Sequence, residues 1–152
     1  MPIQARYAHT NIVAKDWKRL AKFYQAVFGC EIIPPERNHH GPWVDKVTGV
    51  PDAHVRGVHI RLPGWGDDGP TLEIFEYNHV ADSPPPAINA LGLAHLAFVV
   101  DDVEAARRVV LEAGGRDLGE VVTTPVPGAG TITLVYMTDP EGNIFELQRW
   151  SD

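Results

Sequence analysis

The sequence contains one structural pattern twice, at a constant separation. A strand-like segment that begins at His9 and a helix-like segment that ends at Gly29 are followed later by a strand from His95 and a helix that ends at Gly115. The two histidines are 86 positions apart, and so are the two glycines. Agreement at both ends of the pattern indicates two copies of one supersecondary unit. The chain is therefore predicted to fold as two related modules.

Both predicted helices carry an apolar stripe and a capping residue. In the first helix the apolar residues follow the i, i+3, i+4, i+7, i+8 spacing of one helical face, at Leu20, Phe23, Tyr24, Val27 and Phe28. In the second helix the stripe consists of Val103, Ala106, Val110 and Ala113. Asp16 and one of Asp101 or Asp102 are suitable N-caps, and Gly29 is a suitable C-terminal stop.

Strand-like segments follow each helix. They are residues 31–34, 55–62 and 71–77 in the first copy, and 119–123, 131–137 and 143–150 in the second. The order βαβββ, repeated, predicts an α+β fold in which two modules form a curled, mostly antiparallel sheet with the helices outside. We predict a single domain, residues 1–152, with a first module at 5–78, a proline-containing linker at 79–92 and a second module at 93–150.

Four possible metal ligands occupy matching places in the two modules. His9 and His95 begin the first strand of each copy, whereas Glu73 and Glu146 each lie between two apolar residues in the last strand. Because side chains alternate along a strand, all four could face one concave surface. A carboxylate in a covered cavity is costly unless it is paired or bound to metal. Each residue alone is more often a core histidine or a solvated edge carboxylate, and only the set of four favours a divalent metal site.

Three further residues are candidates for substrate binding. His59 and Arg61 share one face of their predicted strand, and Arg61 could hold a carboxylate or phosphate through two parallel hydrogen bonds. A surface ion pair is an equally good interpretation of Arg61. Trp43 lies in a long connection, residues 37–51, that is either a lid over the site or a surface insertion.

Four motifs resemble those of the vicinal oxygen chelate superfamily, which includes glyoxalase I. They are His9-Thr10-Asn11-Ile12, Leu72-Glu73-Ile74, Ala94-His95-Leu96-Ala97-Phe98, and the segment from Asp139 to Leu147. The resemblance implies that His9, Glu73, His95 and Glu146 bind one divalent metal ion, such as Zn, Ni, Co, Mn or Fe. It also implies proton transfer next to a carbonyl group of a small substrate, with Glu146 or Glu73 as the base. This is the chemistry of glyoxalase I-like lyases and of epimerases.

The same resemblance leaves two other functions open. Extradiol dioxygenases of the superfamily hold Fe(II) with two histidines and one glutamate, but they usually have longer chains and no fourth donor. Bleomycin resistance proteins bind a drug without metal, and they usually lack the full donor set. Residues 47–51 are more similar to epimerases than to glutathione-dependent relatives. Relatives often dimerise, so the resemblance also implies a homodimer.

Charge and composition exclude several other functions. A formal net charge of −7 without any cluster of Lys or Arg argues against nucleic acid and against an anionic membrane surface. No apolar segment approaches the roughly 20 residues that span a bilayer. The N-terminus has no export signal, and the only cysteine, Cys30, fits a packing role in a reducing compartment. We therefore expect a cytoplasmic protein.

Overall fold

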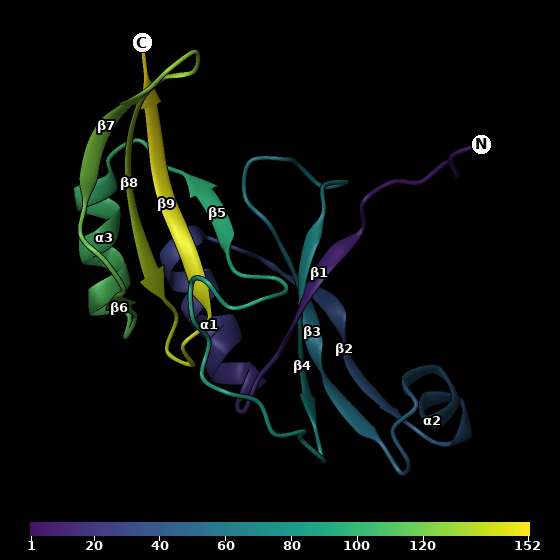
Figure 1. Ribbon diagram of the computed structural model, residues 1–152. Coiled ribbons are helices and arrows are strands. Elements are labelled where there is room, and N and C mark those ends of the chain that lie inside the picture. The colour runs from purple at the N-terminus through teal and green to yellow at the C-terminus, as the bar shows by residue number, and fades with distance from the viewer. The chain divides into compact units, whose positions relative to one another are not determined.

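The computed structural model describes all 152 residues, which form two compact units, residues 1–82 and 83–152. Each unit is an α+β module with its own sheet and its own packed helix (Figure 1). The first contains β1 (His9–Val13), α1 (Trp17–Phe28), β2 (Ile32–His40), α2 (Pro42–Thr48), β3 (His54–Arg61) and β4 (Thr71–Tyr77). The second contains β5 (Leu96–Val99), α3 (Val103–Glu112), β6 (Arg116–Asp117), β7 (Val122–Val126), β8 (Gly130–Thr138) and β9 (Ile144–Ser151). The predicted fold of two βαβββ modules is confirmed.

The two sheets share one pairing scheme. The first has the strand order β1-β4-β3-β2, and the second has the order β5-β9-β8, with β6 and β7 both paired to β8. In each unit the first strand runs parallel to the last, whereas the other pairs are antiparallel, so both sheets are mixed. Asn11 lies opposite Glu73, and Ala97, 86 positions after Asn11, lies opposite Glu146. The repeat therefore extends to the hydrogen-bonded register.

One face of each sheet packs under the helix of its own unit. In the first sheet this buried row is Val58, Ile60, Leu72 and Ile74, and in the second it is Val135, Met137, Phe145 and Leu147. Asp16 accepts a hydrogen bond from the Arg19 N–H at the start of α1, and Asp102 accepts one from Ala105 at the start of α3. The apolar alternation and the N-caps are thus as the sequence predicted. The alternate side chains of each strand lie on the opposite face of the sheet, away from the helix.

The connection expected over residues 37–51 is more ordered than the sequence indicated. β2 continues to His40, past a register shift between Ile33 and Arg37, and α2 follows at once. A seven-residue helix is too short to show a helical period in sequence. It is held instead by burial of Val44 against Ala53 and Val55, with Pro42 in its first turn.

Gly57 keeps β3 close to its neighbours beside the site. A Cβ atom at this position would lie 1.9 Å from the carbonyl oxygen of Ile74 and 2.8 Å from Cδ1 of Phe75. The first atom belongs to the backbone of β4, so it cannot rotate away. Gly57 therefore allows β3 to lie close to β4 at a position two residues before His59.

Replacing Gly57 with alanine is expected to lower the free energy of unfolding by about 1–3 kcal/mol, because the new methyl group overpacks the sheet. Gly119→Ala is the matched control, since its Cβ would meet nothing within 4 Å, and its effect should stay within about 0.5 kcal/mol. Urea unfolding of both variants checks this. Equal stabilities for the two variants would contradict the close approach.

Candidate metal centre

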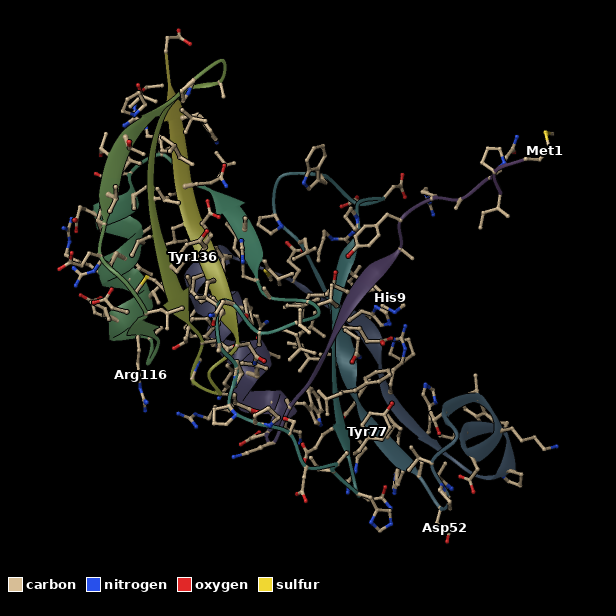
Figure 2. The ribbon with its side chains drawn as sticks, in the orientation of Figure 1. Met1, His9, Asp52, Tyr77, Arg116 and Tyr136 are labelled. Atoms are coloured by element: carbon tan, nitrogen blue, oxygen red, sulfur yellow. The ribbon has the colours of Figure 1, made fainter.

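Three possible metal ligands meet on the open face of the first sheet. His9 comes from β1 (Figure 2), Glu73 from β4 and His59 from β3. One donor atom from each of the three lies within 4.8 Å of the others. Nε2 of His9 is 3.4 Å from Oε1 of Glu73, and Nε2 of His59 is 2.7 Å from Oε2. Sheet pairing explains the convergence, because Glu73 lies directly opposite His59 on one side and Asn11 on the other.

Polar neighbours hold the donors of this His9–His59–Glu73 cluster in place. The Asn11 amide donates a hydrogen bond of 2.9 Å to Oε1 of Glu73. Nδ1 of His59 is hydrogen-bonded to the Thr71 hydroxyl at 2.8 Å, so Nε2 is the ring nitrogen directed to the carboxylate. Partners of this kind orient the ligands of metal sites. The Glu73 and His59 side chains are only 13% and 16% exposed, whereas His9 is 40% exposed.

The environment of His59 favours its neutral form. Burial is the largest influence and lowers the pKa of the imidazole from 6.5, while the Glu73 carboxylate acts in the opposite direction. The charges of Arg37 and His9 add to the effect of burial. A neutral imidazole is the form that binds metal.

The second unit repeats half of this arrangement. Nε2 of His95 is 3.4 Å from Oε1 of Glu146, the same separation as between His9 and Glu73. Glu146 is buried, and its Oε2 accepts a hydrogen bond of 2.7 Å from the Gln148 amide. At the position opposite Glu146 on β8, where the first unit has His59, the second unit has Tyr136 (Figure 2). The Tyr136 ring lies edge-on to His95, with 5.0 Å between ring centroids.

The residues present fit a divalent metal. Two imidazoles and one carboxylate in the first unit are donors that first-row divalent metals accept. The sequence placed His59 among the substrate contacts and did not predict that it lies beside His9 and Glu73. The signal that could have identified it is the β3–β4 register, which sets His59 opposite Glu73 and which the sequence does not fix.

The remaining predicted contact residues lie in different surroundings. Arg61 is on the same face as the cluster, opposite Thr71. Trp43 is on α2, 56% exposed, with its ring 5.1 Å from that of His39.

Cys30 is buried, and burial raises the pKa of its thiol to about 11, so it stays protonated and packs as expected.

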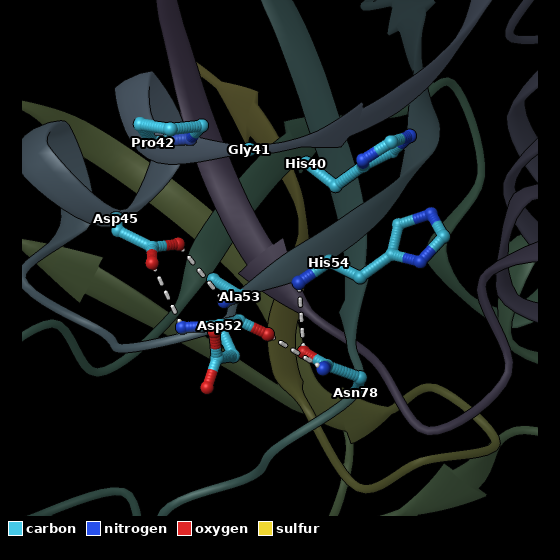
Figure 3. Close-up of a pocket in the computed structure, with 8 residues that line it drawn as sticks. All are labelled: His40, Gly41, Pro42, Asp45, Asp52, Ala53, His54 and Asn78. Atoms are coloured by element: carbon cyan, nitrogen blue, oxygen red, sulfur yellow. Dashed lines mark hydrogen bonds between the residues drawn. The ribbon is translucent and has the colours of Figure 1, made fainter.

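A pocket of about 460 Å³ lies at the α2–β3 connection of the first unit (Figure 3). It is lined by His40, Gly41, Pro42, Asp45, Asp52, Ala53, His54 and Asn78, none of which belongs to the cluster. The Asp45 carboxylate accepts hydrogen bonds from the backbone N–H groups of Asp52 and Ala53, and Asn78 bonds the backbone of Asp52 and His54. Asp45 and Asn78 therefore close the α2–β3 connection through these hydrogen bonds.

Comparison with known proteins agrees with the fold. A family model described as the Glyoxalase/Bleomycin resistance protein/Dioxygenase superfamily matches residues 6–147. A probable lactoylglutathione lyase of Vibrio parahaemolyticus is 28% identical over 93% of this chain and 88% of its own length. An ethylmalonyl-CoA/methylmalonyl-CoA epimerase of Cereibacter sphaeroides is 25% identical over 95% and 97%. A solved glyoxalase family protein of Bacillus cereus has the same fold, with a TM-score of 0.82 at 22% identity over 99% and 97%.

No helix in the structure combines the length and the apolar character needed to cross a membrane.

The lowered pKa of His59 predicts a pH dependence of stability for the metal-free protein. The unfolded chain binds a proton at this imidazole at higher pH than the folded chain does. The contribution to stability is therefore complete above 6.5 and is lost as the pH falls toward the folded pKa. His59→Gln should reduce the rise in unfolding free energy that occurs as the pH increases to 6.5, measured by urea unfolding with a chelator present.

His79→Gln provides the control, because His79 is exposed and outside the cluster. Its pH dependence should equal that of the unmodified protein. Equal slopes for His59→Gln and His79→Gln would contradict the burial effect.

Proposed function

Because the chain belongs to the glyoxalase/bleomycin resistance protein/dioxygenase superfamily, we propose that it is a divalent-metal-dependent enzyme that transfers a proton next to a carbonyl group. Its reaction is that of a glyoxalase I-like lyase or of an epimerase. The supporting observation is the His–Glu pair that occurs in both units with the same Nε2–Oε1 separation of 3.4 Å. Relatives that are named as a lyase and an epimerase support the same class of reaction.

We propose His9, Glu73, His95 and Glu146 as the donors for one divalent ion per chain. The ion, when bound, acts as a Lewis acid that stabilises the negative charge developing on a carbonyl oxygen as the neighbouring proton leaves. His59 and Arg61 are proposed to contact the substrate on the same face of the first sheet. A substrate role for Trp43 stays a prediction from the sequence.

The surroundings of the two carboxylates favour Glu146 as the base. Glu73 has three side-chain neighbours, His9, His59 and Asn11, which hold both of its oxygens. Glu146 has two, His95 and Gln148, and its Oε1 faces only the imidazole at 3.4 Å. A carboxylate with fewer fixed partners is freer to rotate and to accept a proton. In this proposal Glu73 positions, whereas Oε1 of Glu146 accepts the proton and returns it.

A second candidate function is ring cleavage by an Fe(II) dioxygenase. The His9–His59–Glu73 cluster favours it, because two histidines and one carboxylate are the donor set of non-haem iron oxygenases. The two reactions are separable by one property. Proton transfer proceeds without oxygen, whereas ring cleavage consumes oxygen in the presence of a catechol.

Elemental analysis of the purified protein should find about one divalent ion per chain, and chelation should lower Tm, because a ligand that binds only the folded state stabilises it. His9→Ala and His95→Ala should each lower metal affinity at least about tenfold. Loss of a residue that only hydrogen-bonds to a metal ligand already lowers the affinity by about that factor. His79→Ala should leave it unchanged. If the protein has no metal, and its Tm does not change when metals are returned, the proposal is wrong and a metal-free drug-binding function is favoured.

Glu146→Gln should reduce exchange of the substrate proton in deuterated water by at least about a hundredfold, because a general base contributes a factor of 10²–10⁴. Methylmalonyl-CoA and lactoylglutathione are the test substrates, and mass spectrometry measures the exchange without oxygen. Glu112→Gln, which changes an exposed carboxylate on α3, is the matched control. Full exchange by Glu146→Gln would remove Glu146 from the mechanism.

A further inference from the structure

Arg61 lies on the same face of the first sheet as the His9–His59–Glu73 cluster. It is directly opposite Thr71 in the β3–β4 ladder, and the Thr71 hydroxyl is hydrogen-bonded to Nδ1 of His59. Directly opposed residues direct their side chains to the same face of a sheet. Successive residues on one face are about 6.5–7 Å apart along a strand, so Arg61 is one such step from His59.

The guanidinium of Arg61 has an unused donor. Its Nε is buried and has no hydrogen-bond partner, the only buried side-chain nitrogen or oxygen in this condition. One terminal nitrogen, Nη1, donates to the backbone carbonyl of Asp67. The nearest acidic partner, Oδ1 of Asp67, is 4.0 Å from Nε, which is too far for a hydrogen bond, and the Asp67 side chain is 97% exposed. A buried charged donor without an acceptor is unfavourable, and a bound anion would relieve this cost.

Arg107 shows the geometry of an arginine whose Nε donates a hydrogen bond to a carboxylate. Arg107 donates from Nε to Oδ1 of Asp117 at 2.8 Å and from Nη2 to Oδ2 at 2.6 Å. This is the two-point geometry in which guanidinium groups hold carboxylates. At Arg61 the corresponding Nε has no carboxylate within hydrogen-bonding distance.

A second arginine lies along the sheet on the other side of His59. Arg37 on β2 lies opposite Gly57, which is one same-face step from His59 on the side away from Arg61. The cluster is therefore flanked along the sheet by two guanidinium groups.

We propose that Arg61 anchors a carboxylate of the substrate, so that the substrate is a small carbonyl acid rather than a neutral carbonyl compound. The carbonyl half of this statement rests on the proposed function, and the carboxylate half rests on Arg61. One same-face step between Arg61 and His59 requires that the carboxylate lies within a few bonds of the reacting carbonyl. A phosphate at the far end of a long cofactor would not meet this requirement.

The test compares pyruvate with methyl pyruvate, which has the same carbonyl but no charge. Calorimetry on the metal-loaded protein should find that pyruvate binds at least about tenfold more tightly, as expected for a charge-assisted pair of hydrogen bonds. Arg61→Met should abolish this preference while metal content stays unchanged. Arg61→Lys retains the positive charge but cannot donate two parallel hydrogen bonds, so it should lose most of the preference for pyruvate. Arg56→Met is the matched control, because Arg56 is exposed on the opposite face of the same strand.

A second readout requires neither metal nor catalysis. The Nε–H resonance of Arg61, assigned by its loss in Arg61→Met, should shift with pyruvate and not with methyl pyruvate in both metal-free and metal-loaded protein. Arg61→Met that binds metal and still prefers pyruvate would overturn this inference and leave the proposed function intact. Absence of metal from the protein would overturn the proposed function, and the Nε–H shift would then decide the carboxylate anchor alone. An unshifted resonance in both forms means that there is no anchor.

Discussion

The parallel pairing of the first and last strands of each unit brings together the two His–Glu pairs of the chain. β1 beside β4 brings His9 next to Glu73, and β5 beside β9 brings His95 next to Glu146, although long stretches of sequence separate the members of each pair. Parallel neighbours need a crossover, which here contains a helix that covers the opposite face of the sheet. The same connection therefore buries the apolar rows and leaves the polar rows for ligands.

The two units use this common frame differently. The first surrounds its carboxylate with His9, His59 and Asn11, whereas the second gives Glu146 only His95 and Gln148 as side-chain partners. A carboxylate with more partners is held more firmly and is better suited to positioning. In the proposed reaction the two carboxylates thus have separate tasks, although their distances to histidine are equal.

Features that depend on local pattern could be predicted from the sequence, and features that depend on register could not. The 86-residue offset at the helix starts, the Asp16 cap and the apolar stripes follow from residue spacing and appear in the structure as expected. The sequence predicts the end of the second helix at Gly115, whereas α3 ends at Glu112 with Ala113 as its C-cap. The helix α2 depends on contacts of Val44 with residues beyond it in the chain, and seven residues show no period. The place of His59 beside Glu73 could not be predicted for a similar reason, because the β3–β4 ladder sets it. The unsatisfied Nε of Arg61 likewise depends on packing that no spacing encodes.

Two connected copies of one module also escape a constraint that symmetry would impose. A chain with a single module could obtain a second His–Glu pair only from an identical partner, so every substitution would appear in both halves. Once both copies are encoded in one chain, each can change alone. The equivalent positions differ in this chain, since Asn11 corresponds to Ala97 and His59 to Tyr136. Two modules in one chain thus allow one unit to carry additional polar contacts while the other does without them.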